Sequence, residues 1–500
     1  MKILKLLSGL FTIAALAACS DNNSENIYVK DDAILSNLSQ KSISFEYDGS
    51  VSEGSSSVFT VNCAAVPSVT ASDDWIIVNR TGSANKVHTY SVTVSANELA
   101  ENRNGFITLK SGKSEENITV TQSSAPSLPD SSEPQPLLGI NASDIAKDYI
   151  AGWNIGNTLE ACNNETHVAS EEMWGNPKIN QTYIDGVKDA GFNFIRIPCA
   201  WDYYIIDANY TIDPKWLARV NEVVGMIVDR DMYAIVNIHW DGGWLENNIG
   251  KTSKPELINK QKVLWTQIAK ALGHYNERLL FAGLNEPNAD DEASSASLLE
   301  YEQAFVDAVR ATGGNNEKRT LIFQGPSTNI EHTYNFFKKN PTDPAGDGYM
   351  MAEVHYYSPY QYCLMENDAD WSPVYWFWGN GYHVEGSNRN ATWGEEDYMK
   401  DQFDMMKNQF VSKNIPVILG EFGAYPNEHE KSKQTDFDKE KINESRAYYY
   451  RCVMKFGKER GILPFVWDTG ELISRQDGSI RIQWMIDAIM GGANSATLPY

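Results

Sequence analysis

Two glutamates dominate the chemistry that this sequence offers. Glu286 lies in Asn285-Glu286-Pro287 and Glu421 in Gly420-Glu421-Phe422-Gly423, each directly after an apolar run. Two carboxyl groups that face each other, one protonated and one ionised, are the groups that hydrolyse glycosidic bonds. Arg196 beside Glu421 would favour its ionised form, and that negative charge would raise the pKa of Glu286. The pair therefore predicts glycoside hydrolysis, with Glu421 charged and Glu286 carrying the proton at working pH.

Polar or aromatic side chains end most of the other apolar runs as well. They are Asn154, Arg196, His239 with Trp240, Asn285, His355 with Tyr357, and Trp467. One such residue is readily explained as a satisfied buried polar group, but so many together indicate a binding site. Asn285 can hold a sugar 2-hydroxyl, and Trp467 offers an apolar face to a pyranose ring.

Eight apolar, strand-like runs alternate with helix-like stretches between residues 138 and 500. The runs are Ala151–Asn157, Phe192–Pro198, Tyr233–His239, Leu279–Asn285, Thr320–Gln324, Met350–Tyr356, Pro416–Glu421 and Ile462–Trp467, and the stretches include Pro214–Asp229, Lys262–His274, Ser295–Ala311, Tyr398–Lys413 and Ser445–Lys458. This alternation predicts an α/β fold, a (β/α)8 TIM barrel whose active site lies at the carboxyl ends of the strands. An open doubly wound sheet is the alternative, but Trp153 stands where its glycine-rich turn would be.

A smaller all-β domain precedes the barrel. Residues 36–122 contain short alternating runs such as Val87 to Val94, which predict antiparallel strands in an immunoglobulin-like sandwich. Its one tryptophan, Trp75, is expected in the core. A proline- and serine-rich linker, residues 123–137, separates it from the catalytic domain at 138–500.

The first residues carry an export signal. Lys2 and Lys5 precede an apolar run that ends at Ala18, directly before Cys19. This pattern resembles a bacterial lipobox, with residues 1–18 removed and Cys19 lipidated; an ordinary signal peptide is the alternative. Since Ser20 follows the cysteine, we expect a lipid-anchored protein of the outer membrane, at the cell surface. Such a protein is expected to associate with other surface proteins of glycan utilisation.

The composition of the chain limits the classes of molecule that it is expected to bind. The net charge of −24 disfavours nucleic acid, while 14 Trp and 25 Tyr suit a neutral polysaccharide. Cys63, Cys162, Cys199, Cys363 and Cys452 form no metal-binding spacing and are expected mainly as core residues, with one disulfide left open. His239 and His355 lack further ligands nearby in sequence, so we predict no metal and no cofactor.

The motifs together resemble glycoside hydrolase family 5 of clan A over residues 140–490. Besides the two glutamate motifs, the resemblance rests on Gly152 to Glu160, Trp174-Gly175-Asn176-Pro177 and Arg196-Ile197-Pro198. It is closest to subfamily 4, which holds endo-β-1,4-glucanases, xyloglucanases and mixed-linkage glucanases. The resemblance implies Glu286 as acid/base and Glu421 as nucleophile of a retaining double displacement, with the carboxyl groups about 5–5.5 Å apart. Trp240 departs from the family, where many members have a second histidine.

The N-terminal strands resemble the BACON domain of Bacteroidetes carbohydrate-active proteins, on Asp74-Trp75, Val92 to Asn97, Arg103-Asn104-Gly105 and Ile118 to Gln122. We expect this domain to act as a spacer. The predicted substrate is an internal β-1,4-glucosidic bond of xyloglucan, mixed-linkage glucan or a cellulose-like chain. An endo-β-1,4-mannanase and a noncatalytic surface glycan-binding lipoprotein remain alternatives. The long segment 358–396, with Trp371, Trp376, Trp378 and Trp393, is expected to be part sugar-binding wall and part local core.

Overall fold

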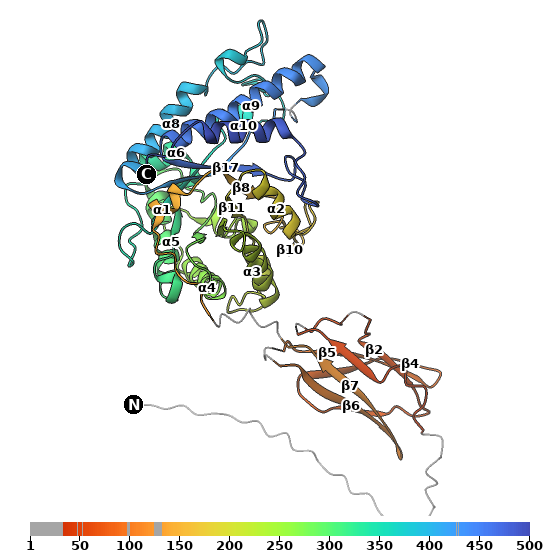
Figure 1. The fold of residues 1–500 in the computed structure, drawn as a ribbon. Coiled ribbons are helices and arrows are strands. Elements are labelled where there is room, and N and C mark those ends of the chain that lie inside the picture. The colour runs from red at the N-terminus through yellow and green to blue at the C-terminus, as the bar shows by residue number, and fades with distance from the viewer. Residues whose placement is uncertain are drawn as a thin grey trace, which may run out of the picture. The chain divides into compact units, whose positions relative to one another are not determined.

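The computed structural model describes residues 34–47, 49–52, 54–97, 101–124, 133–426, 428 and 430–500. They form two compact units that divide between residues 125 and 126 (Figure 1). The signal peptide and Cys19 lie outside the described residues, as does most of the linker, so these remain predictions. No helix in the described part of the chain has the length and apolar character needed to cross a membrane.

The N-terminal unit consists of two facing sheets of strands. They have the orders β1-β7-β6-β3 and β2-β5-β4, from β1 (Ser42–Phe45), β2 (Val58–Asn62), β3 (Ser68–Ala71), β4 (Ile76–Ala84), β5 (Val87–Val94), β6 (Arg103–Ser111) and β7 (Ser114–Gln122). Alternate side chains of β5 and β7 are buried, as expected of a sandwich. One pairing differs from the prediction, because β1 runs parallel to β7. Trp75 is only partly buried, at the rim of the core, where the guanidinium of Arg103 lies 4.3 Å from its ring.

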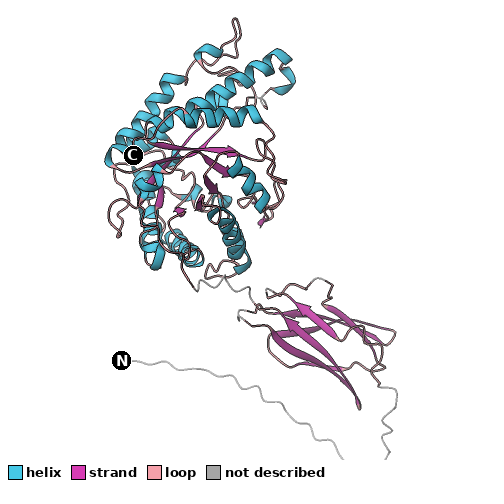
Figure 2. Cartoon of the chain, in the orientation of Figure 1, coloured by secondary structure: helices cyan, strands magenta, loops and turns pink. Residues whose placement is uncertain are grey.

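The second unit is a closed barrel of eight parallel strands, which confirms the predicted fold. Figure 2 shows the strands enclosed by helices. The strands are β8 (Gly152–Ile155), β11 (Phe194–Ile197), β12 (Tyr233–Asn237), β13 (Leu279–Ala282), β14 (Leu321–Gln324), β15 (Met350–Tyr356), β16 (Val417–Phe422) and β17 (Ile462–Asp468). Each coincides with one of the eight predicted apolar runs.

The helices of this unit are α1 (Ala142–Lys147), α2 (Gln181–Asp189), α3 (Pro214–Val228), α4 (Pro255–Ala271), α5 (Glu292–Arg310), α6 (Ile330–Phe336), α7 (Tyr360–Cys363), α8 (Glu396–Gln409), α9 (Asp436–Glu459) and α10 (Gln483–Asn494). Two of them begin well before the predicted position. Helix α4 starts at Pro255, which suits a first helical turn, and α9 starts after Thr435, whose side chain caps the helix through a capping box with Asp438. A short antiparallel pair, β9 (Cys162–Asn163) and β10 (Val168–Ala169), follows β8.

The amino end of the barrel is closed by apolar packing. Helix α1 and Tyr149 pack there against Phe194 and Phe465, near the amino ends of the strands. Gly152 makes room for this packing, because a Cβ atom at that position would lie 2.4 Å from the Phe465 ring. The polar interior residues are therefore left to the carboxyl ends, where barrel active sites lie.

The barrel unit starts before residue 138. The Gln135 N–H donates to the His274 carbonyl at 2.7 Å, and the Leu138 N–H donates to the Glu277 carboxylate at 2.8 Å. The last residues of the predicted linker are thus bound to the turn before β13. All five cysteines of the described chain are free and buried, so none forms the disulfide left open above.

Candidate active site

Arg196 is the centre of the polar cluster inside the barrel. Its Nη1 donates to Glu421 Oε1 at 3.0 Å and to Asn154 Oδ1 at 3.1 Å, and its Nη2 donates to Asn285 Oδ1 at 2.8 Å. Asn154 in turn donates to the Gly420 carbonyl at 2.8 Å. One guanidinium fork thus joins β8, β11, β16 and the segment after β13.

A bulge in β16 directs Glu421 into this cluster. Strict alternation from the inward-facing Ile418 would make Glu421 point outward, toward the helices. However, the register against β15 and β17 shifts between Leu419 and Phe422, so an extra residue enters the strand. Gly420 permits the bulge, because a Cβ there would lie 1.9 Å from Glu353 Oε1.

The two predicted catalytic glutamates face each other. Tyr357 donates its hydroxyl to Glu421 Oε2 at 3.0 Å, and His355 Nδ1 lies 2.8 Å from Glu286 Oε1 and 3.8 Å from Glu421 Oε2. One oxygen of each carboxylate and a ring nitrogen of His355 all lie within 4.8 Å of one another. This spacing matches the short separation of retaining glycosidases, about 5–5.5 Å, and not the roughly 6.5–9.5 Å of inverting ones.

His355 changes the expected protonation of the pair. Burial disfavours its charged form, yet Glu421, Glu286 and Glu353 raise the pKa of His355 to about 10. Burial raises the pKa of Glu286, but the hydrogen bond and charge of His355 outweigh burial and hold that pKa below its ordinary value. Burial raises the pKa of Glu421, against the charges of His355 and Arg196. The sequence analysis did not include a charged His355 beside the two carboxyl groups, and the assignment of the proton to Glu286 stays a prediction.

The remaining predicted residues lie around the same barrel end. His239 is neutral, since burial together with Arg196 and His355 keeps its pKa well below the ordinary value. Its ring stacks on Trp467, with centroids 5.6 Å apart. Trp467 is partly exposed, as a sugar platform requires. Trp240 is also partly exposed and precedes the turn η2 (Asp241–Gly243).

Two residues that sequence reasoning missed belong to the cluster. Glu353 is fully buried on β15, 2.9 Å from Arg196 Nε and 3.4 Å from His355 Nε2. A carboxylate inside an apolar run, two residues before His355, was the signal for it. Glu246, in the turn η3 (Glu246–Asn248), accepts the Glu286 N–H at 3.0 Å. Nothing in its sequence context distinguishes it from a surface glutamate.

A family model described as cellulase (glycosyl hydrolase family 5) matches residues 155–472, more than half of the chain. The chain belongs to glycosyl hydrolase family 5. A retaining mechanism is general in this family. Residues 52–123 match the BACON model, which agrees with the resemblance of the N-terminal strands.

Three family 5 proteins illustrate the similarity. The xyloglucan-specific endo-beta-1,4-glucanase of Bacteroides ovatus is 32% identical over 479 residues, which are 91% of each chain. A solved structure of a Bacteroides ovatus family 5 xyloglucanase with a XXXG heptasaccharide has a TM-score of 0.66 and 29% identity, covering 92% of this chain and all of that one. A xyloglucan-specific β-1,4-glucanase from a ruminal metagenomic library, in complex with XXLG, has a TM-score of 0.65 and 38% identity over 72% of this chain and 98% of its own.

The long segment after β15 of this family 5 domain contains the predicted local core together with exposed rings, while its sugar-binding role stays a prediction. Trp378 is fully buried, and Trp376 packs against Phe377 and Ile442. Trp371 and Trp393 are exposed by 65% and 41%, and Trp371 stacks on the exposed Tyr360. The exposed pair are the two tryptophans of this segment that could reach sugar.

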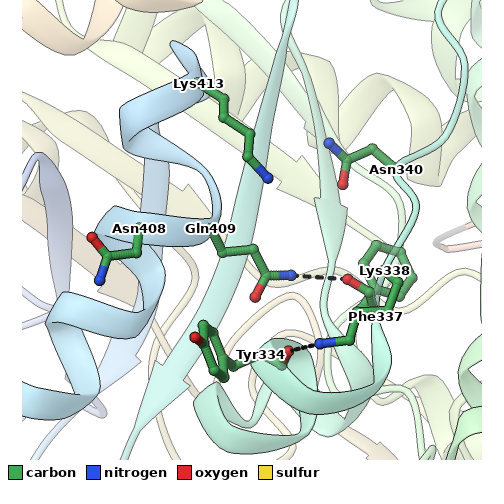
Figure 3. A pocket seen from close by; sticks show the side chains of 7 residues that line it. All are labelled: Tyr334, Phe337, Lys338, Asn340, Asn408, Gln409 and Lys413. Carbon is green, nitrogen blue, oxygen red and sulfur yellow. Dashed lines mark hydrogen bonds between the residues drawn. The ribbon is translucent and has the colours of Figure 1, made fainter.

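The catalytic cluster also contains the residues with metal-ligand spacing in the described part of the chain. The one group there with metal-ligand spacing is Glu286, His355 and Glu421 themselves. Figure 3 shows a separate pocket between α6 and α8, lined by Tyr334, Phe337, Lys338, Asn340, Asn408, Gln409 and Lys413. None of the residues that line it carries a carboxylate.

Proposed function

We propose that this family 5 protein is an endo-acting β-1,4-glucanase that cleaves plant cell-wall β-glucans, with xyloglucan as the preferred substrate. One observation carries the reaction: the carboxylate of Glu421, bonded by Arg196 and Tyr357, faces Glu286 at the spacing of a retaining pair. The substrate is supported by the similarity to xyloglucan-specific enzymes, one of them along 91% of this chain.

In the proposed reaction Glu421 attacks the anomeric carbon and forms a covalent glycosyl-enzyme. The proton that His355 holds 2.8 Å from Glu286 passes to this carboxyl once substrate excludes water, and Glu286 then protonates the leaving oxygen. Attack consumes the charge of Glu421. Glu286, now ionised, removes a proton from the incoming water, which releases the sugar with retained configuration.

A panel of polysaccharides tests the substrate. The purified protein is incubated with xyloglucan, mixed-linkage glucan, carboxymethyl cellulose and glucomannan, and released oligosaccharides are compared with those of Glu421→Ala. We expect release from xyloglucan first, abolished in the variant. Cleavage of mannan chains alone would identify a mannanase instead. Binding without release from any of them would identify a noncatalytic glycan-binding protein.

The acid role of Glu286 has its own test. Glu286→Ala should lose most activity on polysaccharide, because the sugar leaving group needs a proton. It should keep far more activity on an aryl β-cellobioside whose phenol leaves without one. Equal losses on both substrates would contradict the acid role.

We also propose that the protein is a lipoprotein anchored through Cys19 to the outer membrane, at the cell surface, where it works beside other glycan-utilisation proteins. The apolar run that ends at Ala18-Cys19 supports this. Wild type should incorporate a clickable fatty acid and be cleaved by protease on intact cells, whereas Cys19→Ala should lose the label. If the wild type takes up no label, the protein is secreted through an ordinary signal peptide and is not lipidated. Co-purification from crosslinked cells tests the association.

A further inference from the structure

The segment that carries Glu286 leaves its strand before the glutamate is reached. Strand β13 ends at Ala282, and the N–H of Leu284 is already bonded by a side chain, Gln324 Oε1, at 2.7 Å. Pro287 has no N–H. The N–H groups of Glu286 and Asn288 are therefore not bonded within the strand, and their acceptors come from elsewhere in the fold.

Glu246 supplies both acceptors. Its Oε2 receives the Glu286 N–H at 3.0 Å and faces Asn285 Nδ2 at 3.4 Å, while its backbone carbonyl receives the Asn288 N–H at 2.9 Å. One residue thus binds the chain on both sides of Pro287.

The turn that holds Glu246 is itself firmly fixed. Leu245 and Ile249, on either side of η3, are buried, and the Ile249 carbonyl accepts the Ser297 hydroxyl of α5 at 2.9 Å. Asn248 closes the turn by donating to the Trp244 carbonyl at 3.1 Å. Glu246 is therefore a rigid support rather than a mobile surface side chain.

The carboxylate also brings negative charge to the site. The charged groups that face it are Glu286 and Glu421, both acidic. Burial and these neighbours raise the pKa of Glu246 to about 7, against the N–H of Glu286 and the amide of Asn285. By reciprocity an ionised Glu246 raises the proton affinity of the Glu286–His355 pair.

We propose that Glu246 is a positioning residue that fixes Asn285 and Glu286 for catalysis and whose charge helps the Glu286–His355 pair keep its proton. This inference rests on the proposed acid role of Glu286. Glu246→Ala removes the side-chain acceptor and the charge. Glu246→Gln keeps an acceptor oxygen and removes the charge. Asn248→Ala, which loosens the same turn without touching residues 285–288, is the matched control.

The first measurement does not depend on catalytic activity. Amide hydrogen exchange of Glu286 should be roughly tenfold faster in Glu246→Ala, since its N–H loses its hydrogen-bond acceptor. Glu246→Gln and Asn248→Ala should stay near wild type. Because this readout is independent of turnover, it holds even if the wild type hydrolyses no glucan, which would refute the proposed function alone. Unchanged exchange in Glu246→Ala would overturn the positioning role.

The second measurement is the pH profile of kcat/KM on a cello- or xylogluco-oligosaccharide and on an aryl β-cellobioside with a good leaving group. In Glu246→Gln the alkaline limb should move down by about half a unit or more on the oligosaccharide. In Glu246→Ala, kcat should fall roughly 10–100-fold on it and less on the aryl glycoside. Equal losses on both substrates with a wild-type pH profile would leave only a structural role and overturn the proposal.

Discussion

At the residue scale, adjacent tyrosines at the end of β15 have opposite surroundings. The Tyr357 hydroxyl donates to Glu421 at 3.0 Å, whereas the buried Tyr356 hydroxyl has no hydrogen-bond partner and its ring packs on Phe403. Tyr357→Phe should lower kcat/KM about 10–100-fold, the worth of a hydrogen bond to a charged group. Steady-state kinetics on an aryl β-cellobioside measure this. Tyr356→Phe, as the matched control, should keep wild-type kcat/KM and lose no stability; equal effects of both changes would contradict the special role of Tyr357.

His355 makes a prediction about stability and pH. Its pKa in the folded protein is about 10, above the ordinary 6.5, in spite of its burial. Its contribution to the stability of the folded protein is thus fully present below pH 6.5 and is lost as the pH rises toward 10. In this pH range the folded state binds more protons than the unfolded state. The free energy of unfolding of wild type should fall more steeply between pH 7 and 10 than that of His355→Gln, measured by urea denaturation. Parallel slopes would contradict a protonated His355.

At the scale of elements, the bulge of β16 depends on a missing side chain. In Gly420→Ala the new Cβ would lie 1.9 Å from Glu353 Oε1, so Glu353 or the strand must move, and with it Arg196 and Glu421. We expect a loss of about 1–3 kcal/mol in stability, typical of overpacking, and a loss of most activity. Urea denaturation and hydrolysis of xyloglucan measure both. Gly381→Ala, where a Cβ meets nothing within 4 Å, is the control. A Gly420→Ala variant with wild-type stability and activity would refute the need for a glycine at the bulge.

The elements were more predictable from the sequence than the contacts between them. Apolar runs with polar ends located all eight strands, because burial on both faces leaves a continuous hydrophobic signal. The inward direction of Glu421 was not predictable, since it depends on a register shift between strands. Glu353 was marked only by its place inside an apolar run, and Glu246 bonds backbone atoms forty residues away in sequence. The contact of His355 with Glu286 was not predictable either, because only the closed barrel brings the two side chains together.

At the scale of the whole molecule, the two units are expected to work independently on soluble substrate. In the N-terminal unit the Trp75 ring is covered on one face by Arg103, and Phe106 is the one strongly exposed aromatic ring among its described residues. A glycan platform usually presents several rings, so this unit is better suited to be a spacer.

Truncated chains test whether the N-terminal unit is only a spacer. A chain of residues 133–500 keeps Gln135 and Leu138 bound to the turn before β13, whereas one that starts at residue 139 loses both hydrogen bonds. We expect 133–500 to match the full chain in kcat/KM on soluble xyloglucan and to bind insoluble glucan as well as it does. The shorter chain should unfold at lower temperature, by scanning calorimetry, because Glu277 loses the N–H donor of Leu138 and keeps only that of Gly139. If 133–500 binds insoluble glucan clearly less well than the full chain, and Phe106→Ala reproduces the loss, the N-terminal unit is a glycan-binding domain and not a spacer.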